Sequence, residues 1–181
     1  MRDIFKVGFT LLLITAFAGL TLGMTNAITA EPIRKQADAA ATAARQQVLP
    51  DAAEFTKVET DAVEEAYQGY TADGTFCGGT AKVTVQGYGG PIEVTVGMDA
   101  AGCLTAVNVG GTDFSETAGL GAKTKDAAFT AQFSGQLAPV ALAKDGGSID
   151  AVSAATISST AVVNAVNQAS AYLLTLIQGG H

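Results

Sequence analysis

The sequence predicts an α+β protein, built as an antiparallel sheet flanked by helices, with one transmembrane helix at the N-terminus. Three observations predict this class. Residues 81–109 alternate between apolar and polar side chains, which is typical of half-buried strands. Residues 158–179 carry apolar side chains at helical spacing, and the first 30 residues contain a long uncharged run.

The uncharged run extends from Val7 to Thr29. At 1.5 Å per residue it is about 34 Å long, enough to cross a hydrocarbon core of ~30 Å. Arg2 and Lys6 precede it, and positive charge stays on the cytoplasmic side, so we expect the chain after Ala30 to lie outside. A cleaved signal peptide is the alternative, but the run exceeds the usual apolar core of such peptides. Both interpretations place the globular part outside the cytoplasm.

Helices are expected next along the chain. Glu31-Pro32 fits a helix start, because Pro is tolerated in the first turn. The Ala-rich stretch 33–48 reads as a helix leaving the membrane, and Leu49-Pro50 ends it. A second helix is expected over residues 52–67.

The middle of the chain changes to a period of two. Turn-like segments at 87–91 and 99–102 separate its alternating stretches, so an antiparallel meander is expected. A Gly-rich loop over 110–123 and a short helix over 125–133 follow. The last helix is expected to begin near Ser158 and to end at Gly179-Gly180.

These elements predict three regions. They are a cytoplasmic tip with the transmembrane helix (1–30), a helical connector packed on the domain (31–70) and an extracytoplasmic α+β domain (71–181).

Composition excludes several functions. The formal net charge is -7, whereas a nucleic-acid-binding surface would be basic. The single histidine is His181, so no His-based metal site or Ser-His-Asp triad can be assembled. Cys77 and Cys103 form no Cys-x-x-Cys motif. In an exported domain they could form a disulfide, and the alternative is two small buried or half-buried residues.

Two segments carry chemistry. The first, Glu116 to Lys123, places a Gly-x-Gly turn between an acid and a base, so that backbone N–H groups can approach a flat or anionic ligand. By itself it is also compatible with a surface turn. The second, Asp150 to Thr160, opens the last helix with a cluster of hydroxyls. Helix N-termini bind phosphate, although the same cluster is compatible with an ordinary N-cap.

Together and in this order, the two segments resemble the FMN-binding domain of the Rnf and Na⁺-translocating NADH:quinone reductase complexes, in particular the G subunit of the Rnf complex. The family signature Asp-x-x-Ser/Thr-Gly-Ala-Thr is similar to residues 150–156, and Glu-Thr-Pro-Gly-Leu-Gly-x-Lys is similar to residues 116–123. Residues 87–92 look like the family's Gly-Tyr-Gly-Gly-Pro-Ile turn. The resemblance covers nearly all of the chain.

The resemblance implies a membrane-anchored electron carrier of an Rnf-type complex that couples ferredoxin and NAD redox chemistry to Na⁺ or H⁺ movement. It implies covalent FMN, esterified to Thr156 by a flavin transferase, with other subunits of the redox complex as partners. Ser153, Ala155 and the N–H groups from Ile157 to Thr160 would hold the phosphate. The ring would lie against the loop, and the implied ring contacts are Glu116, Thr117, Leu120 and Gly121. Lys123 or Lys144 would stabilise the reduced ring.

The chain departs from the family pattern in three places. Ala154 replaces the usual Gly, which is tolerable if its φ angle is negative. Ala118 replaces the usual Pro, and no His precedes Glu116. Three alternatives remain at this point: the C subunit of the NADH:quinone reductase, whose chains tend to be longer, a flavin-free exported interaction module, and a stand-alone extracellular reductase. For the last, the sequence offers neither a substrate site nor a partner domain.

Overall fold

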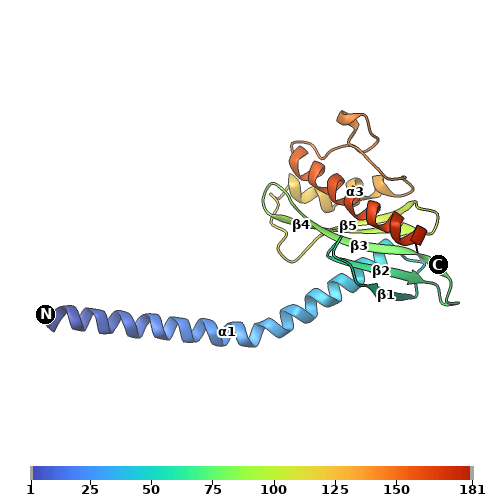
Figure 1. The fold of residues 1–181 in the computed structure, drawn as a ribbon. Helices are drawn as coiled ribbons and strands as arrows, with labels where there is room; N and C mark the ends of the chain where they lie inside the picture. Colours follow the sequence, from blue (N-terminus) through green and yellow to red (C-terminus); the bar gives the residue numbers. More distant parts are fainter. Residues whose placement is uncertain (1, 180–181) are drawn as a thin grey trace. The chain divides into compact units, whose positions relative to one another are not determined.

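A computed structural model describes residues 2–179 of the protein (Figure 1). Gly180 and His181, named above, lie outside the described residues. The chain divides into two compact units, Met1–Ala41 and Thr42–His181, which are described separately below.

The N-terminal helix α1 runs without interruption from Arg2 to Val48. The expected helix start at Glu31-Pro32 is therefore wrong, since Pro32 lies inside the helix. There its ring removes one backbone hydrogen bond, a cost of ~3 kcal/mol that the strong helix formers on both sides offset. The segment from Ile4 onward is long and apolar enough to cross a membrane, and its most apolar window is entirely exposed.

Hydroxyl groups along this apolar segment are satisfied within the helix. The threonine side chains donate to carbonyl oxygens four residues earlier, for example Thr21 Oγ1 to Phe17 O at 2.8 Å and Thr25 Oγ1 to Thr21 O at 2.9 Å. Such bonds remove the cost of placing a free hydroxyl in hydrocarbon. The threonines are therefore compatible with the predicted transmembrane helix.

A five-stranded antiparallel sheet forms the centre of the second unit, in the order β1-β2-β3-β4-β5. This confirms the expected meander over residues 81–109. The strands are β1 (Glu54–Val58), β2 (Glu65–Tyr70), β3 (Phe76–Gln86), β4 (Pro91–Asp99) and β5 (Leu104–Gly110). The helix expected over residues 52–67 is wrong, because β1 and β2 pair with each other and then with β3. The expected connector is thus helical only as far as Val48.

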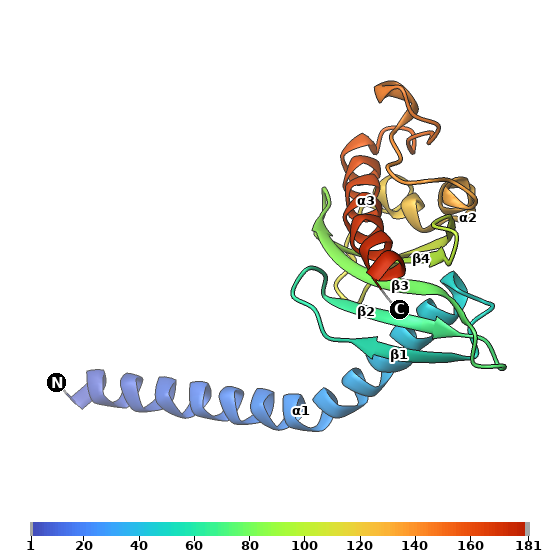
Figure 2. The same cartoon turned by 45° about the vertical axis from the view of Figure 1, so that its right-hand side comes forward.

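Short helical turns replace the single helix expected over 125–133, and they pack against β5 (Figure 2). They are η1 (Gly121–Lys125), α2 (Ala127–Thr130) and η2 (Ala131–Phe133), and a further turn, η3 (Ala143–Asp145), follows. The last helix, α3 (Thr156–Gly179), begins two residues before the expected Ser158. It too is long enough to cross a membrane, but 44% of its most apolar window is buried, so it is a core helix.

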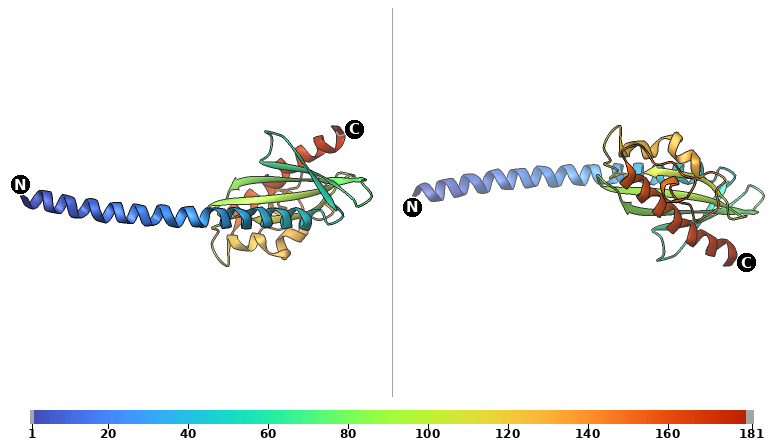
Figure 3. Two further views of the ribbon diagram at one scale, coloured as in Figure 1. Left: turned by 90° about the horizontal axis from the view of Figure 1, so that it is seen from below. Right: turned by 90° about the horizontal axis from the view of Figure 1, so that it is seen from above.

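Both faces of the sheet are covered, α3 lying on one and the end of α1 on the other (Figure 3). A Cβ added at Gly79 would meet the side chain of Leu173 in α3 at 3.0 Å. The next residue, Thr80, points to the opposite face. There, a Cβ added at its cross-strand partner Gly97 would overlap the carbonyl oxygen of Val48. Thr105 Oγ1 donates to the same carbonyl. Contact with α1 explains why β4 is buried continuously from Val94 to Met98 rather than at alternate positions.

The two cysteines lie on opposite sides of β4. Cys77 O accepts from Ala100 N at 3.1 Å, whereas Cys103 O accepts from Asp99 N at 2.9 Å. Two strand spacings separate the cysteines, about 9–10 Å, which exceeds the Cα–Cα limit for a disulfide. Both are free, which favours the expectation of two half-buried thiols.

A cluster of charges joins the end of α1 to the sheet. Lys82 Nζ lies 2.9 Å from Glu65 Oε1, and Arg45 Nη1 lies 3.3 Å from Glu65 Oε2. The guanidinium of Arg45 also stacks on the ring of Tyr67, 4.1 Å from its centroid. Burial acts to raise the pKa of Glu65, but the hydrogen bond and charge of Lys82, with the charge of Arg45, outweigh it and lower that pKa below 4.5.

Glu65→Gln tests this cluster. Because the pKa of Glu65 is lower in the folded protein, its stabilising effect is present above its ordinary pKa of 4.5 and is lost as the pH falls through the lowered value. We expect the variant to be less stable by about 1 kcal/mol at neutral pH, with the difference disappearing in acid. Thermal unfolding of the detergent-solubilised chain at several pH values measures this. Equal pH profiles for both proteins would contradict the assignment.

Candidate functional site

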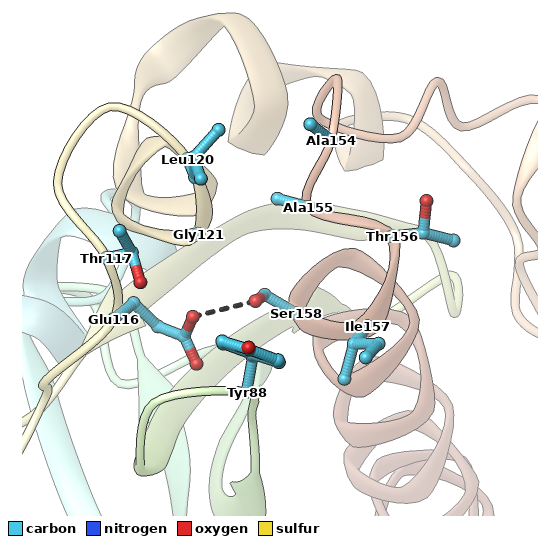
Figure 4. A pocket seen from close by; sticks show the side chains of 10 residues that line it. All are labelled: Tyr88, Glu116, Thr117, Leu120, Gly121, Ala154, Ala155, Thr156, Ile157 and Ser158. Carbon is cyan, nitrogen blue, oxygen red and sulfur yellow. Dashed lines mark hydrogen bonds between the residues drawn. The ribbon is translucent and has the colours of Figure 1, made fainter.

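A pocket of about 420 Å³ opens at one end of the sheet (Figure 4). Three segments that are distant in sequence form it: the β3–β4 turn, the loop after β5 and the N-terminus of α3. Its lining residues are Tyr88, Glu116, Thr117, Leu120, Gly121, Ala154, Ala155, Thr156, Ile157 and Ser158. This volume lies in the range of small-molecule and cofactor sites.

The carboxylate of Glu116 connects the three segments. Gly89 N, in the β3–β4 turn, donates to Glu116 Oε1 at 3.0 Å, and Ser158 Oγ, in α3, donates to Oε2 at 2.8 Å (Figure 4). Glu116 is only 8% exposed. Sequence reasoning placed this residue against the ligand, whereas the structure shows both of its oxygens bonded to the protein.

Glycines make this close packing feasible. A Cβ at Gly87 would overlap Glu116 Oε1, and a Cβ at Gly121 would overlap Oε2. On the other side of the turn, Ser115 Oγ donates to Gly89 O at 3.1 Å. The turn that carries Tyr88 is therefore held at both the N–H and the C=O of one residue.

The N-terminus of α3 faces this pocket with free N–H groups. Ser159 N donates to Ala155 O at 3.0 Å, the first bond of the helix. The N–H groups of Thr156, Ile157 and Ser158 consequently have no partner in the preceding turn, and no described side chain caps them. The free donors thus run from 156 to 158, because those of Ser159 and Thr160 lie inside the helix. Such a terminus attracts a phosphate through its N–H groups and the helix dipole.

The hydroxyls around this terminus differ in availability. Ser158 and Ser159 are buried, and both already donate, to Glu116 and to Ala155 O respectively. Ser153 and Thr156 are exposed. The Thr156 hydroxyl points away from the Glu116–Ser158 bond (Figure 4). Of these four, only Thr156 is both accessible and part of the pocket.

Apolar side chains surround the opening. Tyr88 is 70% exposed, Ile157 59% and Leu120 41%. Within the described part of the second unit, Leu137 is the only other exposed large apolar side chain. Three of four such side chains therefore gather at one pocket, which favours a flat, apolar ligand there.

The structure brings most of the sequence-predicted site residues together. Those lining the pocket are Glu116, Thr117, Leu120, Gly121, Ala155, Thr156 and Ile157. Ser153, Lys123 and Lys144 do not line it, and Lys144 pairs with Asp145 at 3.0 Å. Three residues that the sequence analysis did not select also line the pocket: Tyr88, Ala154 and Ser158. The family-like turn was the signal for Tyr88, but nothing in the sequence marked Ser158 as the partner of Glu116.

Backbone geometry sets Ala154 apart. Its φ is 58°, the only positive value among the non-glycine residues that the structure describes. The condition for tolerating Ala in place of Gly, a negative φ, is therefore not met. An L-residue in this left-handed region costs about 1–2 kcal/mol.

Comparison with known proteins first identifies the class of domain to which the sheet and its pocket belong. Residues 87–171 match the FMN-binding domain family. NqrC of Shewanella oneidensis shares the fold, with a TM-score of 0.54 at 16% identity over 72% of this chain and 73% of that one. The C subunit of the Na⁺-translocating NADH-quinone reductase from Parabacteroides distasonis gives 0.52 at 22% identity, over 62% of each chain.

Sequence relatives then define the family. The G subunit of the Na⁺-translocating ferredoxin:NAD⁺ oxidoreductase complex from Acetobacterium woodii is 34% identical over 92% of this chain and 89% of that protein. The G subunit of the ion-translocating oxidoreductase complex from Methanosarcina acetivorans is 32% identical over 95% of both. The chain belongs to the family of G subunits of ion-translocating oxidoreductase complexes, known as Rnf.

Ala154→Gly tests the strain at this loop. Glycine adopts a positive φ freely but is more flexible when unfolded, so we expect a net stabilisation of about 0.5–1 kcal/mol. Ala155→Gly is the matched control, because φ of Ala155 is not positive and the change should destabilise the protein. Chemical denaturation measures both. If Ala154→Gly lost as much stability as the control, the left-handed conformation would be refuted.

Proposed function

We propose that this chain is a membrane-anchored electron carrier that holds FMN covalently through Thr156, in an Rnf-type complex coupling ferredoxin and NAD redox chemistry to Na⁺ or H⁺ translocation. The observation that carries the proposal is the position of Thr156. Its exposed hydroxyl stands on the free N-terminus of α3, at the edge of a pocket with apolar walls. The family supports both the flavin and the complex.

The pocket suits the two ends of FMN. The phosphate would lie at the helix N-terminus, held by the N–H groups of residues 156–158. The ring would lie between Leu120 and Gly121 on one wall and Ala155 and Ile157 on the other. Tyr88 offers an aromatic face beside it. FMN, when bound, supplies one- and two-electron redox chemistry.

Attachment needs a flavin transferase with FAD as the donor. A bond forms between Thr156 Oγ and the FMN phosphorus, the pyrophosphate bond of FAD breaks, AMP leaves, and the threonine proton is released. The product is a phosphodiester that no longer depends on binding equilibrium. Such a link is useful on the outside of a membrane, where a dissociated cofactor is lost.

The positive charges before the apolar run support an extracytoplasmic position of the sheet domain. Arg2 and Lys6 lie on a short tip, which positive charge retains in the cytoplasm, whereas long domains are translocated largely regardless of charge. We therefore place the sheet domain outside.

Other functions find less support. Relatives named as G subunits match nearly the whole chain at 30% identity or more, whereas the solved C subunits share the fold at 16–22%. A flavin-free interaction module gives no reason for free helix N–H groups beside an apolar pocket. Within residues 2–179 no cluster of His, Cys, Asp and Glu suits a metal ion.

Thr156→Val removes the attachment oxygen and keeps the shape of the side chain. We expect complete loss of covalent flavin, with a change in stability of no more than about 1 kcal/mol. The measurement is in-gel flavin fluorescence after denaturing electrophoresis of protein co-expressed with a flavin transferase. Ser148→Ala is the control, since Ser148 is exposed, lies outside the signature at residues 150–156 and does not line the pocket, and the variant should remain fluorescent.

Two outcomes contradict the assignment in different ways. A fluorescent Thr156→Val band, with the flavin mapped to another Ser or Thr, would reject the residue. A colourless wild type in the presence of an active transferase would reject the flavoprotein.

Sidedness has its own test. A periplasm-dependent reporter fused after Gly179 should be active, and a cytoplasm-dependent reporter at the same position should be inactive. The reverse pattern would place the sheet domain in the cytoplasm.

A further inference from the structure

Glu116 occupies an unusual position for an acidic side chain. It lines the pocket, is 8% exposed and forms no ion pair with a described Lys or Arg. Its two hydrogen-bond partners, Gly89 N–H and the Ser158 hydroxyl, are both donors. An ionised carboxylate accepts two such bonds, so the geometry suits the charged form.

Each donor belongs to a segment that shapes the site. Gly89 directly follows Tyr88, the aromatic residue at the pocket opening. Ser158 lies in the first turn of α3, two residues after Thr156. The carboxylate thus fixes the separation between the aromatic turn and the helix that carries the attachment residue.

We propose that Glu116 is a positioning residue, which holds the ring pocket open at a fixed width and orients Tyr88 and the start of α3, and that it does not itself bind the ring. This inference rests on the proposed function. The overlap of any Cβ at Gly87 or Gly121 with the Glu116 oxygens supports it, because the carboxylate is the nearest group to both positions and the absence of a side chain there lets it pack closely.

A negative charge at this position also acts on the ligand. Because it forms no ion pair with a described Lys or Arg, it opposes the negative charge that a flavin gains on reduction, and so lowers the reduction potential. Position and charge can be separated. In Glu116→Gln the amide can accept from Gly89 and donate to Ser158 Oγ, keeping the bridge but not the charge. In Glu116→Ala both the hydrogen-bonded bridge and the charge are lost.

The experiment compares Glu116→Gln, Glu116→Ala and Ser158→Ala in the full-length protein co-expressed with a flavin transferase. Three quantities are measured: covalent flavin by in-gel fluorescence, ring order by visible circular dichroism and the flavin midpoint potential. Glu59→Gln is the control for charge, because the Glu59 side chain is 90% exposed. Amide hydrogen exchange of flavin-free Thr156→Val, with and without Glu116→Ala, reports on the loop without any cofactor.

We expect all three variants at Glu116 and Ser158 to retain covalent flavin. Ring circular dichroism should persist in Glu116→Gln, fall in Ser158→Ala and vanish in Glu116→Ala. The potential should rise in Glu116→Gln and stay unchanged in Glu59→Gln. In the flavin-free background, Glu116→Ala should speed exchange at residues 87–90 and 117–121 by at least tenfold, while β2 stays protected.

Wild-type dichroism and potential in both Glu116 variants would overturn the inference, and so would unchanged exchange in the loops. Equal loss of ring order in Glu116→Gln and Glu116→Ala would show a direct ring contact instead. If Glu116→Ala fails to fold, the ring dichroism of Ser158→Ala and the midpoint potential of Glu116→Gln still test the inference. A wild type without covalent flavin rejects the proposed function, whereas the exchange measurement judges the positioning role independently.

Discussion

The site depends on burying one carboxylate among three segments of the chain. Glu116 reaches Gly89 and Ser158, which lie 27 and 42 residues away in sequence. A buried acid without these donors would cost several kcal/mol, so the turn, the loop and the helix are stable only together. The sheet allows these contacts, because its antiparallel order brings the β3–β4 turn and the C-terminal end of β5 to the same end of the sheet.

The sequence predicts the elements whose apolar residues follow a simple period. β3, β4 and β5 have one face on α3, and their apolar residues alternate accordingly. β1 is an edge strand with no buried residue, so Glu54–Val58 offers no such pattern, and a helix is expected there instead. Pro32 gives a false helix start, since the local preference of proline cannot reveal that helix formers continue on both sides.

For the site, residue types are predictable and partners are not. The glycines of the loop and the hydroxyls before α3 mark the two walls of the pocket, and most residues chosen from them line it. That the Ser158 hydroxyl is bonded to Glu116 depends on packing between segments 42 residues apart, which no local pattern encodes. The φ angle of Ala154 is likewise a tertiary property, because alanine itself disfavours it.

The position of α3 at the end of the chain has a consequence for the order of biogenesis. One wall of the pocket comes from residues 154–158, and the helix they begin must dock on β3 and β4 before that wall exists. Synthesis proceeds from the N-terminus, so the pocket is completed only after every strand has been made. A chain that ended within α3 would therefore lack apolar side chains that pack on β3 and β4, and its pocket would stand on an incompletely covered sheet.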